Sequence, residues 1–179
     1  NTGASQDEYD AVHGAGAFVR LEVPALAQRA AEPARWLPAN EITPDVSGVF
    51  ASAPERLRPE RADLGLWNVF GNPAAPDVQA MLERALNPRG ELTSEVVLAS
   101  ALGRFKTPSL RDLGQSPPYL HSGRFDEIED VLRFYVRMSQ LAHAGKLRNP
   151  PPEFAAMRLS SEDVEALAAF LRALNEDYD

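Results

Sequence analysis

The 179-residue chain contains no cysteine. Within these residues, that absence excludes disulfide bonds, cysteine-ligated zinc, iron–sulfur clusters and catalysis by a thiol nucleophile. The chain also lacks any apolar run near the roughly 18 residues that a membrane-spanning helix requires. We therefore expect no membrane span.

Positive charge is the minority charge. The chain has 18 basic and 26 acidic residues, which gives a formal net charge of −8. Because a negative surface repels phosphate groups, this balance argues against nucleic acid or an anionic membrane as a partner. Apolar residues make up 44% of the chain, enough for a buried core, and the length fits one domain or one domain with an extension.

Several stretches carry the spacing or the start and stop signals of helices. We predict helices over residues 24–31, 75–86, 93–102, 127–144 and 161–174. The apolar residues expected to share a buried face are Val78, Met81, Leu82 and Leu86 in the second helix, Ile128, Val131, Leu132, Tyr135, Met138 and Leu141 in the fourth, and Val164, Leu167, Phe170, Leu171 and Leu174 in the fifth. Ser160 and Asp163 resemble a capping box.

The remaining stretches look irregular. Residues 1–16 show no convincing period, and prolines break up residues 33–61. Residues 63–72 fit a short strand or an extended buried segment, and the prolines at 150–152 favour an extended connection. The sequence therefore predicts a mainly α chain with long irregular loops. Such loops are unusual in a helical bundle and suit a fold that wraps a cofactor.

One loop concentrates positive charge. Residues 101–125 contain one acidic residue and four basic ones, which are Arg104, Lys106, Arg111 and Arg124. Thr107 and Pro108 fit the start of a short helical turn over 108–113, and Gly114 fits its end. The start of such a turn presents backbone N–H groups to an anion. The loop is either an anion site or, more commonly, a solvated segment with local ion pairs.

This loop and the helix predicted after it include possible metal ligands. A lone histidine such as His121 is more often structural than a ligand, and Tyr119 alone is most often a core residue. Tyr135 and Met138 lie three residues apart and share one face of a predicted helix. A tyrosinate favours ferric iron, whereas a thioether favours ferrous iron. From the spacing alone, packing in the core is the commoner role for both.

Three blocks in order resemble the bacterial di-haem cytochrome c peroxidases and MauG-like enzymes. They are Phe-Lys-Thr-Pro-Ser-Leu-Arg at 105–111, Pro-Tyr-Leu-His-Ser-Gly at 118–123, and an acidic helix start that leads to Phe-Tyr at 134–135. Residues 66–72 and Asn-Thr-Gly at 1–3 also resemble family segments. The resemblance is strong over 105–135 and weak over 4–63.

The resemblance implies a fold and a domain organisation. The whole of residues 1–179 would be the C-terminal part of a cytochrome c-like haem domain, the second haem domain of such enzymes. Residues 1–65 would form a loop-rich wrapping segment and residues 66–179 a helical core. The haem-pocket loop would span residues 104–125.

The resemblance also implies roles for single residues. Haem c would be contacted by Phe105, Lys106, Thr107, Pro108, Leu110, Arg111, Tyr119, His121, Tyr135 and Met138. Tyr135 falls at the distal axial position of the iron, as in the MauG branch, and Met138 is the second choice. His121 would lie beside the haem without binding the iron. The backbone carbonyls of Ser116 and Pro118 would bind a calcium ion.

The C-x-x-C-H motif that anchors haem c is absent from this sequence. The resemblance therefore implies a C-terminal piece of a longer periplasmic peroxidase-like oxidoreductase, and we expect the piece alone to be inactive. Its partners would be the N-terminal haem-bearing part of the same protein and an electron-donor protein or a protein substrate. Two alternatives stay open: a haem-free module of the same fold, and a haem held without covalent bonds by His13, His121 or His143.

Overall fold

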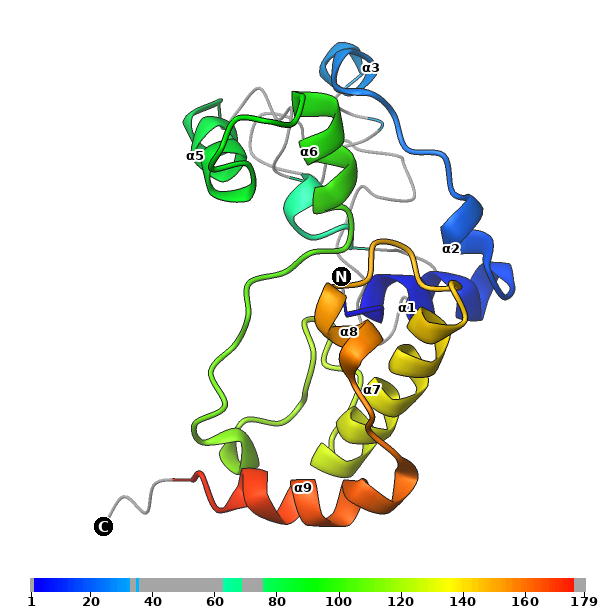
Figure 1. Cartoon of the computed structure of the whole chain (residues 1–179), viewed down its shortest axis with the longest axis vertical. Coiled ribbons are helices and arrows are strands. Elements are labelled where there is room, and N and C mark those ends of the chain that lie inside the picture. Colours follow the sequence, from blue (N-terminus) through cyan, green and yellow to red (C-terminus); the bar gives the residue numbers. More distant parts are fainter. Residues whose placement is uncertain (1, 33–34, 36–62, 69–75, 176–179) are drawn as a thin grey trace. The chain divides into compact units, whose positions relative to one another are not determined.

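The structure is a computed structural model that describes residues 2–32, 35, 63–68 and 76–175. These residues form helices joined by irregular segments (Figure 1). They contain no strand beyond the isolated bridges Gly65–Arg104 and Tyr119–Phe125. The predicted mainly α class is therefore confirmed. The chain divides into two compact units, Gly3–Phe105 and Lys106–Asp179, which we call the N-terminal unit and the C-terminal unit.

The described part of the N-terminal unit is helical. Its elements are α1 (Ala4–His13), α2 (Ala17–Arg20), α3 (Leu26–Ala31), the 3-10 helix η1 (Leu66–Asn68), α5 (Pro76–Leu86) and α6 (Ser94–Ala101). The helices predicted over 24–31, 75–86 and 93–102 are confirmed. The Thr93 side chain caps α6 by accepting a hydrogen bond from the Val96 N–H at 3.4 Å. Helices α1 and α2 were not predicted.

A physical reason explains why α1 escaped prediction. Its first five residues are all buried, and four of them are polar or charged. A helix that buries polar residues shows no apolar stripe, so its sequence lacks the period that predicts an amphipathic helix. In α5, the predicted apolar face is only partly buried. Leu82 and Leu86 pack on the core, whereas Val78 and Met81 are exposed.

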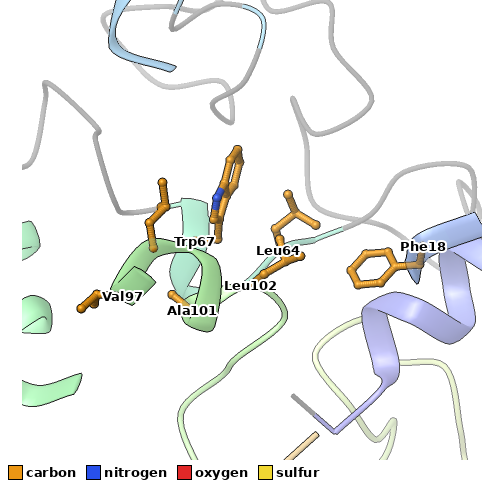
Figure 2. Packing of buried hydrophobic residues seen from close by; sticks show 7 residues of the cluster. Phe18, Leu64, Trp67, Val97, Ala101 and Leu102 are labelled. Atoms are coloured by element: carbon orange, nitrogen blue, oxygen red, sulfur yellow. The ribbon is translucent and has the colours of Figure 1, made fainter. Parts of the chain in front are cut away.

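The core of the N-terminal unit gathers around α6 and η1 (Figure 2). Its buried residues are Phe18, Leu64, Trp67, Val97, Leu98, Ala101 and Leu102. Backbone hydrogen bonds join the two chain segments, from the Leu66 N–H to the Arg104 carbonyl at 2.7 Å and from the Gly103 N–H to the Leu64 carbonyl at 2.9 Å. Gly65 has φ 63°, and a Cβ there would collide with the Arg104 carbonyl. Glycine is therefore required for this close approach.

The segment predicted as a strand or an extended buried piece is partly described. Leu64 and Trp67 are fully buried as expected, but residues 66–68 form η1 rather than a strand. Residues 69–72 of this prediction lie outside the described residues. Residues 36–62 also lie outside them, and the proposed division into a wrapping segment and a core stays a prediction.

The C-terminal unit contains the 3-10 helices η2 (Leu113–Gln115) and η3 (Ser161–Asp163) and the helices α7 (Ile128–His143), α8 (Pro152–Ala156) and α9 (Val164–Arg172). The helices predicted over 127–144 and 161–174 are confirmed, with η3 as the first turn of the second. The Ser160–Asp163 capping box is present. Helix α8 was missed because consecutive prolines favour extension, although proline is well tolerated in a first helical turn.

The predicted turn over 108–113 is wrong. Residues 105–110 are irregular, and the helical turn comes later, at η2. The Ser109 hydroxyl accepts a hydrogen bond from the Arg111 N–H at 3.1 Å. This local side-chain contact competes with helix formation at that point. Gly114 lies inside η2 rather than at the end of a turn, and its N–H donates to Asn175 Oδ1 at 3.0 Å.

The core of the C-terminal unit lies between α7 and α9. Its buried residues are Ile128, Leu132, Val136, Val164 and Ala168, with Leu113, Tyr119, Leu159, Leu167 and Leu171 packed against them. Phe170 was predicted to be buried and is 57% exposed. Val164 and Ala168 form the buried i, i+4 pair of α9, and Phe170 falls outside that stripe.

A bidentate ion pair joins α7 to α9. The two Nη atoms of Arg172 donate to the two carboxylate oxygens of Glu129 at 2.6 and 2.7 Å. This hydrogen bonding lowers the pKa of Glu129 below its ordinary value. A carboxylate with a lowered folded-state pKa stabilises the fold at neutral pH, and that contribution is lost as the pH falls through the folded-state pKa.

We expect Glu129→Gln to lower the melting temperature modestly at neutral pH, because exposed pairs contribute little. The difference from the wild type should shrink as the pH falls below the ordinary glutamate pKa of about 4.3, and it should shrink with added salt. Calorimetric melts at several pH values measure both trends. Glu91→Gln changes an exposed glutamate and serves as the matched control. A difference that persists unchanged in acid would contradict the electrostatic origin.

Candidate functional site

The predicted pocket loop is largely exposed. Lys106, Thr107, Pro108, Leu110 and Arg111 all have exposed side chains, and Phe105 is half-buried. Leu110 is a large apolar residue with 54% of its surface exposed. Apolar and cationic side chains side by side on an exposed segment can contact a ligand that has an apolar body and anionic ends.

A tight loop follows, anchored at both ends. The Tyr119 N–H donates to the Phe125 carbonyl at 2.6 Å, and the Tyr119 hydroxyl donates to the Leu113 carbonyl at 2.6 Å. Gly123 adopts the predicted left-handed conformation, with φ 64°. His121 lies in this loop and is exposed. Tyr119 is thus half-buried with its hydroxyl hydrogen-bonded, whereas His121 is exposed.

The two predicted calcium donors come directly before this loop. Ser116 and Pro118 are both exposed, and the Ser116 hydroxyl donates to the Asp112 carbonyl at 2.8 Å. Within the described parts of the chain, no group of three or more histidine or acidic side chains is arranged to hold a metal ion. A calcium ion here would depend on backbone carbonyls.

Tyr135 occupies the middle of α7 inside a series of aromatic rings. Its ring packs edge-on to the rings of Phe134 and Phe154, with distances between ring centres of 5.5 and 6.0 Å. Phe134 in turn contacts Phe125 at 5.8 Å. Phe154 comes from α8, which the sequence analysis missed. The sequence signal that indicates α8 is a glutamate and an aromatic residue directly after Pro152.

The Tyr135 hydroxyl is available for a ligand. Tyr135 is half-buried, and its hydroxyl makes no hydrogen bond with any described residue. Burial raises the pKa of the Tyr135 phenol above its ordinary value, because the anion is poorly solvated in this setting. Met138, the other candidate ligand, is fully buried. Of these two side chains, only that of Tyr135 is partly exposed.

Some of these features fit a haem site. The half-buried phenol of Tyr135, which makes no hydrogen bond with the described residues, suits one axial position of a ferric iron. Aromatic neighbours and exposed cations nearby in sequence suit the faces and propionates of a porphyrin. The residues present therefore fit one wall and one axial donor. This chain supplies no cysteine for covalent attachment.

A separate groove lies in the C-terminal unit, open to solvent, with a volume of about 480 Å³. Its lining residues are Met157, Arg158, Leu159, Asp163, Ala166 and Leu167. None of the predicted site residues is among them. The groove is therefore a different feature from the Tyr135 environment.

Comparison with proteins of known sequence finds relatives of one kind. The chain is 38% identical over 76 residues to the cytochrome-c peroxidase IdrP2 of Pseudomonas sp. (strain SCT), a match that covers 42% of this chain and 18% of that protein. It is 32% identical over 91 residues to the methylamine utilization protein MauG of Paracoccus denitrificans (strain Pd 1222), covering 41% and 23%. Over about two fifths of its length, this chain is similar to cytochrome-c peroxidases and to MauG proteins.

A second MauG protein is similar to the same extent. The MauG protein of Methylorubrum extorquens is 34% identical over 73 residues, which is 41% of this chain and 19% of that protein. The chain spans only about a fifth of the length of the curated relatives it matches. No protein-family model matches the chain, and no solved structure matches it.

These similarities confirm the resemblance to cytochrome c peroxidases and MauG that the sequence indicated. The roles given to individual residues, from Phe105 to Met138, stay predictions. Among residues 2–32, 63–68 and 76–175, no helix combines the length and apolarity that crossing a bilayer demands.

Proposed function

We propose that the chain is the C-terminal part of the second haem domain of a periplasmic di-haem c-type peroxidase or MauG-like oxidoreductase, and that Tyr135 is an axial ligand of its haem iron. One observation carries the proposal. The half-buried Tyr135 hydroxyl has no hydrogen bond among the described residues, in a chain whose relatives are cytochrome-c peroxidases and MauG.

The bound haem would supply the redox chemistry, passing oxidising equivalents from peroxide to a partner. The chain's own contribution is to prepare the phenol. Because burial raises the pKa of Tyr135 above its ordinary value, the phenol without a ligand stays protonated at neutral pH. Phe134 and Phe154 pack edge-on to the ring and fix its orientation. A tyrosinate ligand would stabilise ferric iron over ferrous iron.

The exposed loop would complete the pocket. In this proposal, Phe105, Thr107, Pro108 and Leu110 contact the porphyrin, and Lys106 and Arg111 contact its propionates. Tyr119 and His121 lie beside it without binding the iron. The carbonyls of Ser116 and Pro118 would bind calcium at the base of the loop.

The proposed partners follow from the family. The N-terminal, haem-bearing part of the same protein would supply the covalent anchor and the first haem. An electron-donor protein or a protein substrate would provide the electrons that reduce the peroxide. Because c-type haem is attached outside the cytoplasm, we place the protein in the periplasm. Without the anchor, the chain alone would be inactive.

Haem content tests the proposal. A pyridine haemochrome assay on the longer protein that contains these residues is expected to show c-type haem, and its sequence is expected to carry C-x-x-C-H within about 15 residues before Asn1. A haem-free protein would refute the proposal. It would favour the alternative suggested by the absence of cysteine, a haem-free module that binds an anion or a protein through the exposed loop.

The third alternative is haem held without covalent bonds by a histidine. His143 Nε2 lies 3.0 Å from the Ala155 carbonyl and 3.1 Å from an Arg158 nitrogen, so its ring is already engaged. The His13 ring lies 4.2 Å from the Tyr9 ring. Titrating the chain with haemin and following the Soret band decides the question. A flat titration would exclude this alternative.

A further inference from the structure

The guanidinium of Arg29 is buried in the N-terminal unit with no acidic partner among the described residues. Arg29 lies on α3 and has 0% of its surface exposed. Its guanidinium carbon sits 3.9 Å from the centre of the Trp67 ring, and its Nη1 donates to the Trp67 carbonyl. Arginines are almost never fully buried unless they are paired. This burial therefore calls for a partner.

The remaining donors of Arg29 define what that partner is. Its Nε and Nη2 atoms are buried and donate to no atom of the described residues. These two N–H groups lie parallel on one edge of the planar guanidinium. Two oxygens of a carboxylate can accept from that edge side by side, in the bidentate geometry that arginine favours.

The electrostatics agree with an incomplete site. Burial lowers the pKa of Arg29 to about 9, and no carboxylate among the described residues counteracts that fall. The Trp67 ring covers the guanidinium face, so a ligand would bind in the guanidinium plane. A flat group with two oxygens and one negative charge fits that edge better than a bulky, more highly charged one.

We propose that the Nε–Nη2 edge of Arg29 is a binding site for a carboxylate ligand. A free organic acid and a porphyrin propionate present the same chemical group, so the site does not depend on the proposed haem function. The residues that form it are Arg29 as the double donor and Trp67 as the surface that holds the guanidinium in place.

The test follows the Arg29 Nε–H signal of the full-length chain by nuclear magnetic resonance. The signal is assigned as the one that disappears in Arg29→Lys. Sodium acetate is titrated against sodium chloride at equal ionic strength. We expect a saturable shift and slower exchange with water for acetate only. Arg29→Lys keeps the positive charge but loses the pair of parallel N–H donors. Its affinity for acetate should therefore fall at least about tenfold. In this variant, the backbone amide signals near Trp67 report acetate binding. Arg20→Lys, which alters an exposed arginine, should bind acetate normally.

A second arm separates the two ligand sources. Iron-free protoporphyrin and its dimethyl ester differ only in whether their propionates can bind the arginine. A shift with the diacid but not with the diester identifies propionate as a ligand, whereas a shift with acetate alone identifies a free acid. Either result supports the site.

Two results would overturn the proposal. The first is an Arg29 signal that neither acetate nor the diacid moves. The second is a signal already protected in the ligand-free chain that loses protection when one of the chain's own acidic residues is neutralised. If Arg29→Lys fails to fold, the wild-type comparison of acetate with chloride still decides.

Discussion

Replacing Tyr135 with phenylalanine in the haem-bearing longer protein is expected to change the ferric absorption and electron paramagnetic resonance spectra of one haem. The change removes the proposed oxygen ligand and keeps the ring. Packing against Phe134 and Phe154 should survive, because the two side chains differ only by the hydroxyl. We therefore expect the free energy of unfolding to change by less than about 1.5 kcal/mol.

The control for this prediction is Met138→Leu. Met138 is fully buried one turn further along α7, and leucine conserves its volume. We expect both ferric spectra to match the wild type. Unchanged spectra in Tyr135→Phe, or a changed spectrum only in Met138→Leu, would show that Tyr135 is not an iron ligand. Because the Tyr135 hydroxyl makes no hydrogen bond with the described residues, a large loss of stability in Tyr135→Phe would also contradict the structure.

Truncating Trp67 to alanine is expected to destabilise the N-terminal unit by about 3–5 kcal/mol. Trp67 is fully buried within the cluster that includes Leu64, Val97 and Ala101, and its ring carries the guanidinium of Arg29. The substitution would leave a cavity and would remove the aromatic ring that packs against the buried guanidinium of Arg29. Urea denaturation followed by far-ultraviolet circular dichroism measures the loss, since that signal does not depend on the removed indole.

Met81→Ala is the matched control for this truncation. Met81 lies on α5 with 61% of its surface exposed, and substitutions at such positions change stability by about 0.5 kcal/mol or less. Trp67→Phe keeps an aromatic face for Arg29, and its loss of stability should lie between those of Trp67→Ala and Met81→Ala. A loss below about 1 kcal/mol in Trp67→Ala would contradict the burial of this residue.

Much of the helical content could be predicted because the signals are local. Helices α7 and α9 have apolar residues at helical spacing, and Ser160 and Asp163 form the capping box that their spacing indicates. The Thr93 cap of α6 is a local contact of the same kind. Each of these features depends on hydrogen bonds and faces within one or two turns, so a short stretch of sequence contains all the information.

The errors arose where neighbours distant in sequence decide the outcome. Helix α1 buries polar residues, and local hydrophobicity cannot reveal this. Phe170 fits the apolar spacing of α9, yet the contact with α7 uses Val164 and Ala168 and leaves Phe170 exposed. In residues 108–113, a serine hydrogen bond replaced the helical turn that Thr107 and Pro108 indicated.

The sequence by itself determined the mainly α class, the positions of the long helices and the relationship to cytochrome c peroxidases and MauG, because these depend on local spacing and on the order of short blocks along the chain. Only the tertiary structure decided that Met138 is enclosed while the Tyr135 hydroxyl lacks a hydrogen bond. It also decided that Arg29 is buried against a tryptophan 38 positions away. Burial depends on which distant segments meet, and no local pattern contains that information.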